Sequence, residues 1–168
     1  MSEILVVKLG GGAGLDLHAA CDDLAHLART RPVIVVHGVS ARMAELCESR
    51  GVTVEMLVSP SGHSSRYTPP HIRDLFVEAA DAVNREIVAA LESRGVRALG
   101  LTGDAVLRAQ RKDAVRTLMN GRVRLIRDDY TGTIDRVETA RIHSALHTGA
   151  VAVIPPYAMS ADGLLNVD

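Results

Sequence analysis

The sequence predicts an α/β fold, a mainly parallel β-sheet flanked by helices on both faces with a β-hairpin insertion. Short β-branched apolar runs alternate along the chain with stretches of helical periodicity, which is the rhythm of a parallel sheet covered by helices. The first two of these runs each end in a glycine-bearing turn. The pair Asn120-Gly121 lies between two further β-like runs, and such a pair is a strong signal for a tight hairpin.

The composition is that of an ordinary soluble chain. Its 168 residues are 47% hydrophobic and 23% charged, and the formal net charge is −1, so the balance favours neither nucleic acid nor a membrane surface as a partner. No apolar run is long enough to cross a bilayer, and no secretion signal is visible. Cys21 and Cys47 both fall in helical patterns, which favours reduced thiols and a cytoplasmic location.

Apolar periodicity and turn residues place each expected element. The first half contains a strand over 4–7, a helix over 15–30, a strand over 32–36, a helix over 41–50, a strand over 52–58 and a polar loop over 59–70. The second half contains a long helix over 71–94, a strand over 96–101, a short helical piece over 105–110, a hairpin of 115–118 with 123–126, a polar turn over 128–133, a helix over 135–148, a strand over 150–154 and a β-like run from 164. The long helix carries a wide apolar stripe, which indicates packing on the sheet or on a partner subunit as well.

Glycine turns follow the first two expected strands. In a parallel sheet, ligands bind beyond the carboxyl ends of the strands. That edge would gather five small or basic residues: Lys8, Gly10, Gly11, Gly38 and Ser40. Glycines let backbone N–H groups approach an anion, and a helix N-terminus and a lysine add positive charge. These residues favour a phosphate site over a flexible turn with a solvated lysine, although the lysine precedes the glycines and the turn is therefore no Walker loop.

Arg66 lies in the small polar loop Ser64-Ser65-Arg66-Tyr67-Thr68. An arginine in such a loop can pair bidentately with a carboxylate, although the residues by themselves favour a solvated surface side chain. His143 and His147 are four residues apart on one expected helix, but no glutamate accompanies them and no third ligand is near. No metal site is predicted.

Several short motifs, taken in order, resemble those of the amino acid kinase family and, within it, of the acetylglutamate kinase group. The motifs are Val7-Lys8-Leu9-Gly10-Gly11, Val36-His37-Gly38, Ser65-Arg66, Val83-Asn84-Arg85 and Leu164-Leu165-Asn166-Val167-Asp168. The stretches 100–103, 108–112 and 127–133 are similar to the branch that acts on aminoadipate or glutamate linked to LysW, an amino-group carrier protein. The resemblance implies that residues 1–168 form the N-terminal, substrate-binding lobe, and that the C-terminal nucleotide-binding lobe is absent from this chain.

The resemblance also implies a reaction. ATP would phosphorylate the side-chain carboxylate of an N-blocked acidic amino acid, carrier-linked 2-aminoadipate or glutamate, to an acyl phosphate in lysine- or arginine-type biosynthesis. ATP and Mg²⁺ would be bound mainly by the lobe that is absent here. The alternatives are an N-acetylglutamate kinase acting on the free small molecule, and a catalytically incomplete half that binds substrate or regulates an intact homologue.

Site residues follow from the same resemblance. Lys8 would be the catalytic lysine that contacts the transferring γ-phosphoryl group. Arg66 would bind the α-carboxylate of the amino acid, and Asn166 would bind its amide region. The backbone of four residues would cradle the phosphate or the carboxylate: Gly10, Gly11, Gly38 and Val39.

A small acidic carrier protein would approach a basic face of the kinase. Arg108, Arg111 and Lys112 are its expected contacts. Five further arginines could extend that face: Arg66, Arg116, Arg122, Arg124 and Arg127. The alternative is an arginine-studded hairpin without a partner. A homodimer through the helix over 71–94 is the family expectation.

Two departures from the family pattern matter. Val39 stands where the family usually has a second glycine, and a branched residue disfavours positive φ and crowds an anion site. The aspartate that orients the catalytic lysines normally lies two positions beyond Asp168, and the second lysine lies far beyond it. The 168-residue chain alone is therefore expected not to catalyse phosphoryl transfer.

Overall fold

A computed structural model describes residues 3–167. Strands and helices alternate over the first 49 residues, as the apolar runs predict, and further along the chain several strands follow one another directly. The elements are β1 (Leu5–Leu9), α1 (Leu17–Ala28), β2 (Val33–His37), α2 (Ser40–Ser49), β3 (Met56–Val58), β4 (Ser64–Arg66), α3 (Pro70–Glu92), β5 (Ala98–Gly100), α4 (Gly103–Val106), β6 (Leu107–Arg111), β7 (Val115–Met119), β8 (Arg122–Ile126), β9 (Thr131–Val137), α5 (Thr139–His147), β10 (Val151–Ile154), β11 (Tyr157–Ser160) and β12 (Gly163–Val167).

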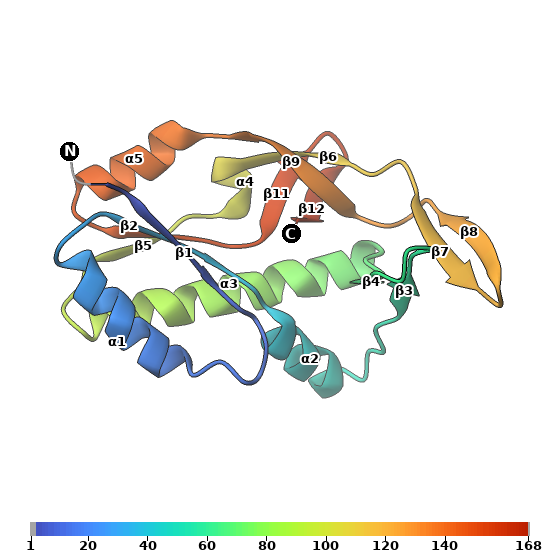
Figure 1. The fold of residues 1–168 in the computed structure, drawn as a ribbon, viewed down its shortest axis with the longest axis horizontal. Coiled ribbons are helices and arrows are strands. Elements are labelled where there is room, and N and C mark those ends of the chain that lie inside the picture. The colour runs from blue at the N-terminus through green and yellow to red at the C-terminus, as the bar shows by residue number, and fades with distance from the viewer. Residues whose placement is uncertain (1–2, 168) are drawn as a thin grey trace.

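Four parallel strands in the order β1-β2-β10-β5 form the central sheet. Helices α1 and α3 cover one face, and α5 covers the other (Figure 1). The strand β10 shows why both faces are covered, because Val151 and Val153 pack with α1 and α3 whereas Ala152 and Ile154 pack toward α5. Such a strand is apolar on both sides and reads as a continuous run. The predicted fold class is confirmed.

A small closed barrel of strands β11-β12-β9-β6 extends the second face of the sheet. It overturns two expectations. The helical piece over 105–110 is wrong, because α4 ends at Val106 and β6 follows directly. The helix over 135–148 begins only at Thr139, because the residues before it belong to β9. In both segments pairing between β6 and β9 prevails over local periodicity.

The chain between α2 and α3 also differs from its prediction. Only Met56–Val58 of the expected strand over 52–58 is extended, and the expected loop over 59–70 contains the short strand β4. The two strands pair as a hairpin, with Met56 opposite Arg66. Arg66 is therefore held on a strand rather than on a free loop.

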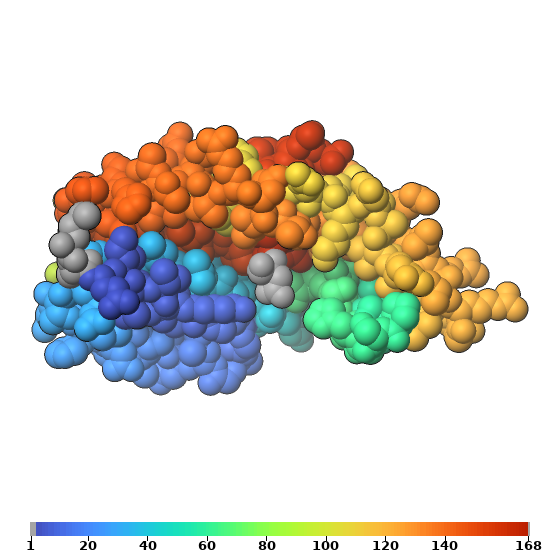
Figure 2. All heavy atoms as spheres, turned by 45° about the horizontal axis from the view of Figure 1, so that its top comes forward, coloured from blue at the N-terminus to red at the C-terminus, as the bar shows by residue number. Residues whose placement is uncertain are grey.

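The hairpin predicted around Asn120-Gly121 is confirmed. Strands β7 and β8 pair around Asn120 and Gly121, whose φ angles are 51° and 72°. Positive φ at both central residues is the requirement of the type I′ turn that suits hairpin twist. Figure 2 shows this hairpin projecting from one end of the molecule.

Helix α3 spans 23 residues and presents its apolar stripe to the sheet and to the two neighbouring helices, α1 and α2. Pro70 occupies its first turn, where a missing N–H has no cost. Most of the wide stripe is thus buried within the chain itself. Within residues 3–167 no helix is both long and apolar enough to span a membrane.

Candidate functional site

The two glycine turns lie side by side at the carboxyl ends of β1 and β2, where Leu9 is in register with His37. Backbone hydrogen bonds join them, because Gly38 N donates to Leu9 O at 2.9 Å and Ala41 N donates to Gly11 O at 2.6 Å. The predicted clustering of these turns at one edge of the sheet is therefore observed.

Contact between the turns explains two of their glycines. A Cβ atom on Gly11 would come closer to the backbone of Gly38 and Val39 than real Cβ atoms approach. A Cβ atom on Gly38 would lie 2.7 Å from Gly11 N. Gly10 and Gly12, in contrast, have open space at the Cβ position. The close packing of the two turns therefore requires glycine at positions 11 and 38, whether or not a ligand binds.

Val39 fits its position without strain. Its φ angle is −137°, so the positive φ that a branched residue resists is not required here. Its side chain is 3% exposed and packs against Met43, Cys47 and Phe76. The valine is part of the core behind the turn, and α2 begins at the next residue.

His37 stabilises the second turn and was not singled out as a functional residue. Its Nδ1 lies 3.3 Å from Gly38 O, and its Nε2 lies 3.4 Å from the amide Nδ2 of Asn84. Asn84 Nδ2 also donates to Val153 O at 3.1 Å. Burial lowers the pKa of His37 to about 4. The ring is therefore neutral at pH 7, and its partners assign the proton to Nδ1, which donates to Gly38 O.

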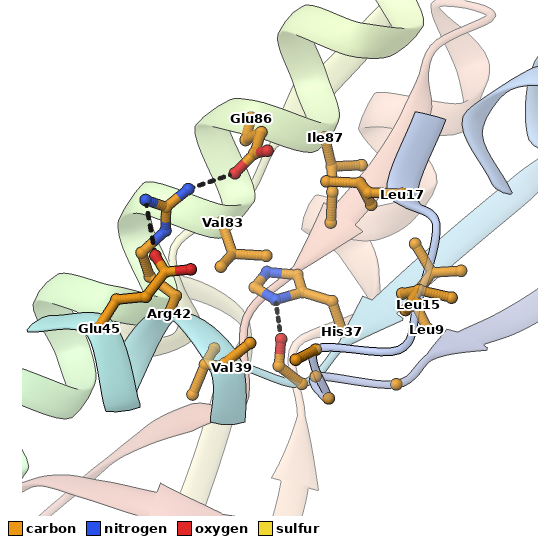
Figure 3. Close-up of a pocket in the computed structure, with 16 residues that line it drawn as sticks. Leu9, Leu15, Leu17, His37, Val39, Arg42, Glu45, Val83, Glu86 and Ile87 are labelled. Atoms are coloured by element: carbon orange, nitrogen blue, oxygen red, sulfur yellow. Dashed lines mark hydrogen bonds and ion pairs between the residues drawn. The ribbon is translucent and has the colours of Figure 1, made fainter. Parts of the chain in front are cut away.

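A first cavity of about 250 Å³ opens between the first glycine turn, α2 and α3 (Figure 3). Its walls are about equally polar and apolar, and His37 faces it beside Val83. Arg42 closes one side through ion pairs to Glu86 at 2.7 Å and to Glu45 at 3.3 Å. Gly10 and Gly11 line this cavity; the exposed side chain of Lys8 does not.

A second cavity of about 290 Å³ lies on the other side of Gly38 and Val39. Arg66 from β4, Lys112 from the chain after β6 and Asn166 from β12 all line it. His63 is the remaining ionisable side chain in its wall, and no acidic residue of the described chain lines it. The cavity therefore gathers predicted site residues from widely separated segments around a space suited to an anion.

Arg66 is a partly buried cation in the wall of this cavity. Its side chain is half-buried, and burial lowers the pKa of its guanidinium, which still remains charged at neutral pH. No carboxylate within residues 3–167 forms an ion pair with it. A partly desolvated cation without a counter-ion is costly unless a ligand supplies the charge. Arg66 is therefore not the solvated surface side chain that the loop residues alone favoured.

Arg108 and Arg111, which are expected to contact the carrier together with Lys112, donate hydrogen bonds to backbone carbonyls. Arg108 donates to Asp104 O, and Arg111 donates to Asp129 O at 2.9 Å and to Arg127 O at 2.6 Å. The guanidinium of Arg111 also stacks on Tyr130, 4.1 Å from the ring centre. The structure does not bring Arg108, Arg111 and Lys112 together as one open surface, and their role in binding a carrier stays a prediction.

Within 3–167 no group of three or more His, Cys, Asp or Glu side chains is arranged to hold a metal ion. The last residue of the motif Leu164–Asp168 lies outside the described residues. Asn166, within the same motif, lies on β12 opposite Thr131 of β9.

The fold and the cavity define an α/β domain with glycine turns at one edge of a parallel sheet and, beside them, a pocket to which the described residues contribute basic but no acidic side chains. A family model described as "Amino acid kinase family" matches residues 3–168, and the chain belongs to that family. The recognised family resemblance is confirmed.

Comparison with curated proteins gives similar relatives of greater length. A LysW-aminoadipate kinase of Deinococcus radiodurans is 36% identical over 98% of this chain, and one of Thermus thermophilus is 33% identical over 98% of it. The chain spans 58% of the first relative and 63% of the second. Among solved structures, N-acetylglutamate synthase from Neisseria gonorrhoeae matches 98% of this chain and 36% of its own, with a TM-score of 0.70 and 22% identity. That likeness supports the fold alone.

Proposed function

We propose that this chain is the N-terminal, substrate-binding lobe of an ATP-dependent kinase. The enzyme would phosphorylate the side-chain carboxylate of an N-blocked acidic amino acid, carrier-linked 2-aminoadipate or glutamate, to an acyl phosphate. The pathway would be lysine- or arginine-type biosynthesis in the cytoplasm. The observation that carries the proposal is the half-buried Arg66, which lines the second cavity and, among residues 3–167, has neither a carboxylate partner nor an acidic neighbour in the cavity wall. The similar relatives named as LysW-aminoadipate kinases support the same substrate class.

Arg66 and Asn166 would fix the amino acid in the second cavity. The planar guanidinium of Arg66 suits bidentate binding of the α-carboxylate. The side-chain amide of Asn166 can both donate and accept hydrogen bonds, which suits the blocked amide nitrogen and its carbonyl. Gly38 and Val39 line the same cavity directly before α2. The side-chain carboxylate would lie there, near the positive end of a ten-residue helix.

Lys8 and the turn of Gly10 and Gly11 would receive the phosphoryl group. A lysine and closely approachable backbone N–H groups suit a phosphate anion. When bound, ATP supplies the phosphoryl group and Mg²⁺ neutralises its charge, and both would be held mainly by the C-terminal lobe. This chain would contribute positioning and electrostatic stabilisation, without a covalent nucleophile.

A small acidic carrier protein is the proposed partner. Lys112 lines the cavity and would meet the carrier where the amino acid is attached. Four arginines of the projecting hairpin and its exit are exposed and could steer the carrier: Arg116, Arg122, Arg124 and Arg127. Steering by exposed charges acts on the association rate and weakens with salt.

A double charge reversal tests this surface. Arg122→Glu with Arg124→Glu should slow association with the carrier at least tenfold at low salt, with a smaller effect at high salt. Binding of the free N-acetyl amino acid should not change. Association rates measured by surface plasmon resonance at two ionic strengths decide the outcome, and an unchanged rate would remove the hairpin from the interface.

Hydroxylamine trapping of an acyl phosphate tests the proposed reaction. The chain would be assayed with ATP and Mg²⁺, alone and with a C-terminal nucleotide-binding lobe supplied from a relative. Carrier-linked 2-aminoadipate should give hydroxamate only when that lobe is present. Equal turnover of free N-acetylglutamate would favour the acetylglutamate kinase alternative. Calorimetric binding of either substrate without turnover under both conditions would favour a substrate-binding or regulatory half.

We also propose a homodimer through the long helix α3. Its outer side leaves Val77 and Val88 half-buried and Ala89 exposed. The same side of α3 in a second copy could cover these side chains. Sedimentation equilibrium of the wild type and of a Val88→Glu variant tests it, and a monomeric wild type would contradict it.

A further inference from the structure

Thr68 is fully buried between the β3–β4 hairpin and α3, and each of its polar groups has a partner. Its N–H donates to Asp129 Oδ2 at 2.8 Å, and its carbonyl accepts from Tyr130 N at 2.7 Å. Its hydroxyl donates to Arg66 O at 3.0 Å and accepts from Asn166 Nδ2 at 3.4 Å. One threonine thus joins the backbone of Arg66 to the side chain of Asn166, the two residues that would bind the amino acid.

We infer that Thr68 is a positioning residue, whose hydroxyl sets the placement of Arg66 and Asn166 relative to each other across the second cavity. Asn166 lies 98 positions further along the chain than Thr68 and on a different sheet from Arg66. Local chain geometry therefore cannot relate the two side chains. The inference rests on the proposed function only in that it names these two residues as the ones that hold the substrate.

Asp129 holds Thr68 in place. Its carboxylate is 2% exposed and accepts hydrogen bonds from Thr68 N and from both the N–H and the hydroxyl of Thr131. No basic side chain of the described chain forms an ion pair with it. These hydrogen bonds are the partners that the described residues give to the buried carboxylate, and such networks hold a single arrangement when every member is satisfied.

Stacking secures the same segment from outside. The ring of Tyr130 lies between two guanidinium groups, that of Arg111 at 4.1 Å and that of Arg73 at 4.8 Å from its centre. Tyr130 O in turn accepts from Asn166 N at 2.9 Å. The backbone of β12 is thus fixed beside Thr68, which leaves the hydroxyl of Thr68 to orient the Asn166 side chain. This gives Arg111 a structural role in the segment that carries the cavity wall.

Substitutions at Thr68 test the inference, with Thr117 as a matched control. Thr68→Val keeps the shape and removes both hydroxyl hydrogen bonds, whereas Thr68→Ser keeps the hydroxyl. Thr117 is equally buried, at 1% exposure, and its hydroxyl also donates to a backbone carbonyl, that of Val58 at 3.2 Å, but it lies outside the cavity wall. Thr117→Val therefore reports what the loss of a buried hydroxyl does by itself.

The first readout is calorimetric affinity of the chain for N-acetyl-2-aminoadipate. Thr68→Val should weaken it about tenfold, which is the usual weight of one hydrogen bond that orients a binding group. Thr68→Ser should bind within about threefold of the wild type, and Thr117→Val should bind like the wild type. Wild-type affinity in Thr68→Val, or an equal loss in Thr117→Val, would overturn the inference.

The second readout needs no ligand. The side-chain amide protons of Asn166, followed by NMR, should shift and exchange faster in Thr68→Val but not in Thr68→Ser or Thr117→Val. If the wild type binds no acidic amino acid, the proposed function fails and this readout alone decides, with unchanged Asn166 signals counting against Thr68. If Thr68→Val does not fold, Thr68→Cys replaces it, because a thiol is a weaker partner in the same place; Asn166 signals like those of the serine variant would then reject the inference.

Discussion

The two glycine turns lie next to the second cavity, because Gly38 and Val39 of the second turn also line that cavity. Different forces nevertheless set the geometry of the two regions. In the turns, two backbones press against each other, so that only hydrogen atoms fit at Gly11 and Gly38. At the cavity, Thr68 joins distant segments through hydrogen bonds to the Asp129 carboxylate, the backbone of Arg66 and the side chain of Asn166. Added side-chain volume should disrupt the turns, whereas the loss of a hydrogen-bond partner should disrupt the cavity. Substitutions that change only one of these properties should therefore separate the two regions.

The largest expected effect is that of Gly11→Ala. The added Cβ would overlap the backbone of Gly38 and Val39, which cannot move without displacing the start of α2. The free energy of unfolding should fall by about 3 kcal/mol, as for a severe overpacking in a rigid site. Urea denaturation measures it. Gly12→Ala, where the Cβ position is open, should change stability by less than about 0.5 kcal/mol. Equal effects of the two changes would mean that the turns are not held by contact.

The next effect separates binding from stability. Arg66→Met removes the cation that faces the cavity and should weaken binding of N-acetyl-2-aminoadipate about 100-fold. Stability should stay the same or rise, because a partly buried charge without a counter-ion is replaced by an apolar side chain of similar length. Calorimetry and urea denaturation give the two quantities. Arg31→Met, at an exposed position, should alter neither. Lost stability without lost affinity would make Arg66 a structural residue.

Local pattern was sufficient wherever neighbours in sequence decide the structure. The parallel strands, the long helix and the Asn120-Gly121 hairpin carry apolar periodicity or a turn requirement that a short window reveals. The barrel escaped prediction because its pairings are distant, with Asn166 opposite Thr131 and no local signal for either partner. Segments that look helical alone become strands when a distant partner satisfies their backbone.

The candidate site was predictable to a similar extent. Glycines at two strand ends indicated the right edge of the sheet, but only the fold shows that Gly11 and Gly38 touch. The family resemblance indicated a binding role for Arg66, whereas the polar loop around it indicated only a solvated surface side chain. The sequence did not indicate a positioning role for Thr68 or Asp129, because threonine and aspartate beside a polar turn are ordinary turn residues. Their role depends on partners about 60 and 100 positions away.

The smallest expected effect is a pH dependence of stability that arises beside the glycine turns, at His37. Unfolded His37, with its ordinary pKa of 6.5, takes up a proton as the pH falls below that value, whereas folded His37 resists protonation until about pH 4. The contribution of the neutral ring is therefore complete above pH 6.5 and is lost as the pH falls toward 4, amounting to about 2 kcal/mol by pH 5. Urea denaturation at pH 7 and pH 5 should show this loss in the wild type and a much smaller one in His37→Gln. In hydrogen exchange over the same range, Gly38 N–H should lose more protection than Tyr130 N–H. Protonation places a hydrogen on Nε2, which can then no longer accept from Asn84 Nδ2, and it charges a buried ring beside Gly38, but it leaves the network around Thr68 intact. An equal pH dependence in His37→Gln would place the sensitivity elsewhere in the fold.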